Sequence, residues 1–150
     1  MMKKLAFAFI LGAAVFACGE EETTIIDSSM PQGTFSVSAM GTIVEQNDTG
    51  SAGTVEVGTD SEGTSFLKFD DDFMTNLGTG TVTVFLSTTS DDLKEVFSPG
   101  TGNTEVILVG VVSQNGEQYF KLASSVASKY DNVVLWCASA GIPFGYAEIQ

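Results

Sequence analysis

The sequence of 150 residues carries 19 acidic against 6 basic side chains, a formal net charge of −13, and contains neither histidine nor arginine. Binding to nucleic acid needs a basic surface that neutralises phosphates, and anionic lipid also attracts basic segments, so the composition excludes both partners. Without an imidazole, a Ser-His-Asp triad, a Cys-His pair and a blue-copper centre are excluded as well.

The start of the chain has the layout of an export signal. Lys3 and Lys4 precede the apolar run 5–17, which is shorter than the roughly 20 residues that cross a bilayer and falls within the usual signal length. The run ends in Val-Phe-Ala directly before Cys18, an order that resembles the lipobox of bacterial lipoproteins. We therefore expect residues 1–17 to be removed and Cys18 to carry lipid. The alternative is an ordinary signal, in which Cys18 has no special role.

A polar tether is expected to follow the lipidated cysteine over residues 18–32. Two or three acyl chains would hold the domain permanently, because each buried methylene contributes roughly 0.8 kcal/mol. The acidic triplet 20–22 resembles the surface-export signal of lipoproteins in the Bacteroidetes group, and the alternative is a solvated charge run. We expect an exported, lipid-anchored protein at the outer membrane, and a surface-exposed one if the triplet is an export signal.

Residues 33–150 predict one all-β domain. Short segments rich in Thr, Val and Phe alternate with turn residues, which is typical of a sandwich or barrel. The expected strands are 34–38, 42–46, 54–57, 65–69, 81–87, 106–112, 118–122, 133–138 and 144–149. The pattern favours a single antiparallel β-sandwich or jelly-roll-like domain, with one or two short helical turns at 91–97 and 124–130. The dipeptide Asn115-Gly116, between two apolar runs, indicates a hairpin.

An acidic run with a nearby amide is the candidate cation site of the domain: Asp70, Asp71, Asp72 and Asn76. Calcium takes six to eight oxygen ligands, which these residues could supply in part. Their spacing does not match the twelve-residue calcium loop, so the alternative of a solvated turn is favoured. No pair of carboxylates stands out as catalytic. Catalytic residues are therefore unassigned, and a role other than that of an enzyme is favoured.

The residue with the most distinctive chemistry is Cys137. It ends the continuous apolar run 133–137, which predicts a central strand covered on both faces and a cysteine at least half buried. With Cys18 lipidated, Cys137 has no partner for an intrachain disulfide. A thiol can exchange disulfides, be oxidised, or bind soft metals and haem. From the residues alone, Cys137 and Trp136 are more often core residues than redox groups.

Six segments follow one another through the domain: 33–35 (Gly-Thr-Phe), 53–57, 82–87, 116–122, 130–137 and 144–147. Their succession resembles the DM-thirteen domain, also called the electron-transfer DM-thirteen family, over nearly all of residues 33–150. The most specific element is a Val-x-x-Trp-Cys strand followed by Phe-Gly-x-Ala. Many members have Pro-Asp where this chain has Gly80 and Thr81, which leaves the role of that carboxylate open. The strand that follows is expected to form nonetheless.

The resemblance implies a β-rich extracytoplasmic domain in which the cysteine matching Cys137 acts in redox chemistry, as a bare thiol or through a bound group such as haem. Without histidine, Cys137 and a methionine, Met40 or Met74, would have to ligate such a group. The alternative is a non-enzymatic surface module that binds a cation, glycan or protein, with Cys137 as a core residue. A third interpretation is a structural lipoprotein without a site. The expected partners are the membrane, through the anchor, and a redox or surface protein.

Overall fold

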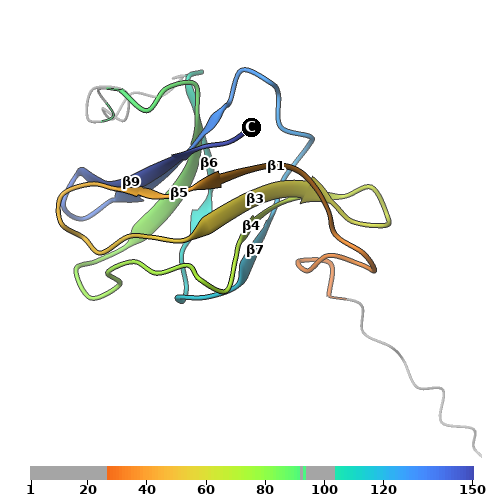
Figure 1. Cartoon of the computed structure of the whole chain (residues 1–150), viewed down its shortest axis with the longest axis horizontal. Coiled ribbons are helices and arrows are strands. Elements are labelled where there is room, and N and C mark those ends of the chain that lie inside the picture. The colour runs from red at the N-terminus through yellow and green to blue at the C-terminus, as the bar shows by residue number, and fades with distance from the viewer. Residues whose placement is uncertain (1–26, 92, 94–103) are drawn as a thin grey trace, which may run out of the picture.

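The computed structural model describes residues 27–150 apart from 92 and 94–103 (Figure 1). The signal, Cys18 and most of the tether lie outside the described residues, as does most of the helical turn expected at 91–97. The strands are β1 (Ser36–Thr42), β2 (Val44–Glu45), β3 (Thr54–Thr59), β4 (Ser65–Phe69), β5 (Val82–Ser87), β6 (Val106–Val111), β7 (Gln118–Lys121), β8 (Asn132–Cys137) and β9 (Ile142–Glu148). In the part of the chain that the structure describes, no helix is long and apolar enough to span a membrane.

Two antiparallel sheets pack face to face (Figure 1). The four-stranded sheet has the order β1-β3-β4-β7, and the five-stranded sheet has the order β2-β9-β8-β5-β6. The expected β-sandwich is therefore confirmed. β8 lies in the middle of its sheet, between β9 and β5, which is the place that the continuous apolar run predicted.

Alternate residues of the inner strands form the core between the sheets, because successive side chains of a strand point to opposite faces. The four-stranded sheet contributes Val55 and Val57 from β3 and Leu67 and Phe69 from β4. The five-stranded sheet contributes Val82, Val84 and Leu86 from β5 and Val133, Leu135 and Cys137 from β8. The same alternation that predicted the strands therefore decides which side chains are buried.

The first two strands differ from the prediction. β1 runs from Ser36 to Thr42 and β2 contains only Val44 and Glu45. The chain leaves one sheet and enters the other at Ile43, whose N–H donates to the Gly53 carbonyl at 2.9 Å and whose side chain is buried. One extended segment thus serves both sheets, and a local pattern of alternation does not show where it changes partner.

The hairpin predicted at Asn115-Gly116 is wrong. The turn joins β6 of one sheet to β7 of the other. Contacts with a distant loop hold it, since Thr75 N–H donates to Asn115 Oδ1 at 2.9 Å and Gly116 N–H donates to the Phe73 carbonyl at 2.8 Å. Residues 124–130 contribute a single hydrogen-bonded turn, closed from Tyr130 N–H to the Ala127 carbonyl at 2.9 Å, rather than a helix.

Candidate functional site

Strand β8 carries the candidate site at its last residue. A run of β-branched and large apolar residues favours a strand that is buried on both faces. Every residue of β8 is buried, and Cys137 has no exposed surface. The strand ends there because the Gly141 N–H donates to the Cys137 carbonyl at 2.8 Å and closes the turn 138–141. The expectation that Cys137 is at least half buried is confirmed.

The sulfur of Cys137 lies close below the surface at one end of the sandwich. A Cβ atom placed on Gly80 would lie 3.8 Å from this sulfur and 2.6 Å from the Ser139 hydroxyl oxygen. Gly80 is exposed and has a φ of +139°, a conformation that favours glycine. Ser139 is exposed as well. The cover over the thiol therefore includes two turns that face solvent.

Trp136 and Cys137 do not form a side-by-side pair. Neighbouring residues of a strand point to opposite faces, and Cys137 points into the core between the sheets. The Trp136 side chain accordingly lies on the outer face of the five-stranded sheet, where it is also buried. The Thr83 hydroxyl donates to the Trp136 carbonyl at 2.9 Å, which fixes the backbone at this point.

The surroundings of Cys137 do not fit a bound haem. Three cavities, of about 330, 250 and 140 Å³, open in the part of the molecule that the structure describes, and Cys137 lines none of these three. Met40 and Met74 each expose about half of their side chains, so neither is a buried axial ligand. The chain offers no imidazole. The described surroundings of the sulfur therefore supply no second ligand for a haem.

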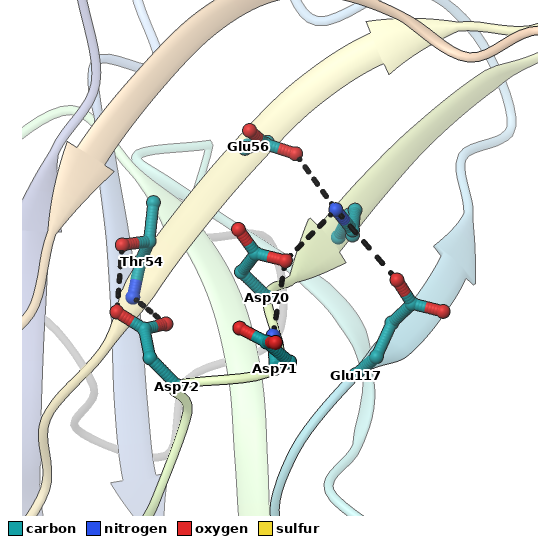
Figure 2. A network of polar contacts seen from close by, with 7 residues as sticks. Thr54, Glu56, Asp70, Asp71, Asp72 and Glu117 are labelled. Carbon is teal, nitrogen blue, oxygen red and sulfur yellow. Dashed lines mark hydrogen bonds and ion pairs between the residues drawn. The ribbon is translucent and has the colours of Figure 1, made fainter.

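Three of the four residues of the candidate calcium site bind other groups, and Figure 2 shows the carboxylates of Asp70 and Asp72 pointing to different partners. Asp70 accepts from Lys68 Nζ at 3.0 Å, and Asp72 accepts from the N–H and the hydroxyl of Thr54 at 2.8 and 2.9 Å. The side-chain oxygen of Asn76 accepts from the Gly78 N–H at 3.0 Å, and Asp71 is exposed. Within the described residues, no three His, Cys, Asp or Glu side chains are grouped to hold a metal ion.

The polar cluster that does form is centred on Lys68, which the sequence analysis did not single out. Its ammonium nitrogen lies 3.1 Å from Glu56, 3.0 Å from Asp70 and 3.7 Å from Glu117, and Figure 2 shows the three carboxylates pointing toward this nitrogen. The sequence could have predicted the contact between Lys68 and Asp70, because residues two apart along a strand lie on the same face of the sheet.

Charge and burial oppose each other at Lys68, whose side chain is only 13% exposed. Burial lowers the pKa of Lys68, but the hydrogen bonds to Asp70 and Glu56 outweigh it, so this pKa lies above its ordinary value of 10.5. The hydrogen bond from Lys68 lowers the pKa of Asp70 in turn. Lys68 and Asp70 are thus held in their charged forms, and the cluster joins β3, β4 and the start of β7.

Comparison with known proteins identifies a protein family. A family model described as electron transfer DM13 matches residues 42–149, a span that contains β2 to β9 and both Gly80 and Cys137. No curated protein and no solved structure matches the chain.

Proposed function

The chain belongs to the electron-transfer DM13 family, and from this premise we propose that it is an exported, lipid-anchored electron-transfer domain whose redox group is the thiol of Cys137. The observation that carries the proposal is the position of this thiol. Cys137 is the free cysteine of the described part of the chain, and its sulfur lies beneath two exposed turns at the end of the central strand.

A buried thiol needs a movement of its cover before it can react. Exposed turns open locally at a lower free-energy cost than global unfolding, and the turns at Gly80 and Ser139 are of this kind. Once the cover has opened, the thiolate of Cys137 attacks a disulfide of a partner protein. A bond forms between Cys137 and one partner sulfur while the partner's S–S bond breaks, and the second partner sulfur leaves as a thiolate with the electron pair.

Thiol labelling of the folded full chain tests the proposal. Without denaturant, we expect Cys137 to be labelled slowly, but faster than the chain unfolds globally. The Cys137→Ser variant should show no labelling at this position. Trapping with an oxidised dithiol protein is expected to yield a mixed disulfide at the same residue. Labelling that proceeds no faster than global unfolding, measured on the same sample, would show that Cys137 is only a core residue.

The anchor is tested separately, because it rests on Cys18. Cys18→Ala is expected to move the protein from the membrane fraction to the soluble fraction, since two or three acyl chains supply the attachment. Cys137→Ala serves as the control and should leave the protein with the membrane. If the Cys18→Ala protein stays membrane-bound, the lipid is not what holds it.

Exposure on the cell surface is a further part of the proposal and depends on the acidic triplet 20–22. Replacing the three glutamates with glutamine is expected to abolish cleavage of the domain by protease added to intact cells, while membrane attachment persists. Unchanged cleavage would mean that the triplet is a solvated charge run and not an export signal.

The second candidate is a non-enzymatic surface module in which Cys137 only fills space. The complete burial of Cys137 in the core favours it. A free cysteine in such a place behaves as a small apolar residue. On this alternative Cys137→Ala would change stability alone, and no mixed disulfide would form.

A further inference from the structure

The side-chain oxygen of Asn132, at the start of β8, is a buried polar atom without a hydrogen-bond partner in the described part of the chain. Asn132 is only 5% exposed, so this oxygen has lost contact with water and has gained no donor. Buried polar groups are nearly always paired, and each exception calls for an explanation such as a bound ion or water. The Asn132 oxygen therefore points to a ligand.

The polar neighbours of Asn132 do not supply a donor for this oxygen. The Asn132 amide nitrogen donates to Asp131 Oδ1 at 2.6 Å, and a carboxylate can only accept, so the nitrogen and not the oxygen faces Asp131. Ser87 lies opposite Asn132 on β5. The Ser87 hydroxyl donates to the Thr89 carbonyl at 2.7 Å and accepts from the Thr89 N–H at 3.2 Å. Its single proton is therefore already used.

Glu148 of β9 lies opposite Asn132 on the other side of β8. The Ile149 N–H donates to the Asp131 carbonyl at 2.8 Å, so Asn132 and Glu148 form the adjacent non-hydrogen-bonded pair, in which side chains lie closer together. The next residue on each strand, Val133 or Ala147, belongs to the core between the sheets. The side chains of Asn132 and Glu148 therefore share the outer face of the five-stranded sheet.

These two side chains line the cavity of about 250 Å³, whose other lining residues are Asp131, Ile149 and Gln150. Among the described residues, neither Asp131 nor Glu148 forms an ion pair, since the ion pairs are made by Lys68. The cavity thus brings two carboxylates without a cation to an amide oxygen without a donor. All three groups are acceptors, so none of them can satisfy another, and each is satisfied by positive charge.

We propose that this cavity binds a divalent cation of the calcium class through the Asn132 amide oxygen, the Glu148 carboxylate and water. Asp131 adds a second negative charge and orients the amide. Two carboxylates match the charge of the ion, and calcium accepts an irregular set of carboxylate, amide and water oxygens, whereas magnesium demands a near-ideal octahedron. The site contains two acidic residues and an amide, which is consistent with the absence of a group of three acidic residues from the described part of the chain.

Calcium titration of the full chain after treatment with EDTA tests the site. By isothermal titration calorimetry we expect one ion per chain, with a Kd of about 10⁻⁴–10⁻³ M, the range of extracellular modules. Magnesium should bind more weakly. Calcium should also raise the melting temperature, because an ion that binds the folded chain stabilises it.

Glu148→Gln is expected to weaken calcium binding about tenfold or more and to remove most of the calcium-dependent rise in melting temperature. Its melting temperature in EDTA should not fall, because Glu148 is exposed. Asn132→Leu removes the amide oxygen at similar volume and should also weaken the binding. Asp71→Asn removes one charge at an exposed position after β4. It is the matched control and should bind calcium as wild type does.

The proposal is overturned if calcium does not bind, because water would then serve the Asn132 oxygen. It is also overturned if Glu148→Gln binds calcium as tightly as wild type, or if Asp71→Asn weakens the binding equally, because the ion would then lie elsewhere or respond only to net charge. The site lies at the opposite end of β8 from Cys137. Its failure would therefore leave the proposed redox role of the thiol unaffected.

Discussion

At the scale of single residues, the reactivity of the Cys137 thiol depends on the two turns, at Gly80 and Ser139, that cover its sulfur atom. Gly80 is left-handed and lies against Ser139, so neither residue can be enlarged without disturbing the other. Cys137 itself is held by the strand and cannot move toward solvent independently. Access to the thiol is therefore controlled by the two turns and not by the cysteine. The glycine at position 80 was visible in the sequence, whereas its position over the thiol was not.

Gly80→Ala is expected to increase the labelling rate of Cys137 in the folded protein. The added Cβ would lie 2.6 Å from the Ser139 hydroxyl, so one of the two turns has to move away from the sulfur. The strained φ also costs stability, on the order of 1–3 kcal/mol. Labelling followed by mass spectrometry, together with urea unfolding, measures both effects.

Gly63→Ala is the control for this prediction. Gly63 has a φ of +79° and nothing within 4 Å of an added Cβ. It should lose stability through the same kind of backbone strain without changing the labelling rate. Equal labelling rates in the two variants would mean that the turn at Gly80 does not cover the thiol.

At the scale of elements, the outer face of the four-stranded sheet is held by a cluster across its strands. Glu56 comes from β3, Lys68 from β4, and Glu117 immediately precedes β7. The Tyr119 ring of β7 lies 6.0 Å from the Lys68 ammonium nitrogen and packs edge-on against Phe66 at 6.3 Å. The Lys68 ammonium group thus connects three strands through carboxylates that differ widely in exposure. Because of this difference, their contributions to the stability of the fold can be measured separately with single substitutions.

Lys68→Met is expected to destabilise the fold by about 3 kcal/mol, because it leaves the mostly buried Glu56 carboxylate without a cation. Glu117→Gln should cost less than about 1 kcal/mol, since Glu117 is half exposed and lies 3.7 Å from the ammonium nitrogen. Urea unfolding of both variants measures the difference. A similar loss in both would contradict the prediction that the contact of Lys68 with the buried Glu56 matters more than its contact with the exposed Glu117.

At the scale of the whole molecule, the segment that precedes β1 is fixed to the sandwich through Asp60. Its carboxylate accepts the N–H groups of Gln32, Glu62 and Thr64 at 2.9, 3.0 and 2.8 Å. The Gln32 hydrogen bond is the largest of several that lower the pKa of Asp60 below its ordinary value of 3.8, while burial acts in the opposite direction. The attachment of the segment around Gln32 to the domain therefore depends on an ionised carboxylate.

Stability is expected to fall in acid through Asp60. Because its pKa is lower in the folded than in the unfolded chain, the stabilisation is fully present above the ordinary value of 3.8 and is lost as the pH falls through the folded value. Asp60→Asn should lower the melting temperature at neutral pH and reduce its dependence on pH below about 4. Asp71→Asn, at an exposed position, is the control. An unchanged pH dependence in Asp60→Asn would contradict the prediction.

The sequence by itself determined the positions of β3 to β9 to within two residues and the burial of β8, because alternation and apolar runs are local properties of the chain. It also determined the motif that resembles the electron-transfer family, which the match over residues 42–149 bears out. For the acidic run 70–72 it could identify only a solvated turn or a cation site. The actual partners, Lys68 and Thr54, follow from strand pairing.

The tertiary structure shows which strands share a sheet. It also shows where the Asn115-Gly116 turn leads, which way Trp136 points and what covers the Cys137 thiol. The Asn115-Gly116 turn crosses between sheets because it bonds to Phe73 and Thr75. Trp136 points away from Cys137 because strand neighbours face opposite layers. The cover over the thiol brings Gly80 and Ser139 together from different loops. The turn and the cover depend on contacts between residues far apart in the chain, which a local pattern does not contain, whereas the direction of Trp136 follows from the alternation of β8 once β8 is part of the sheet.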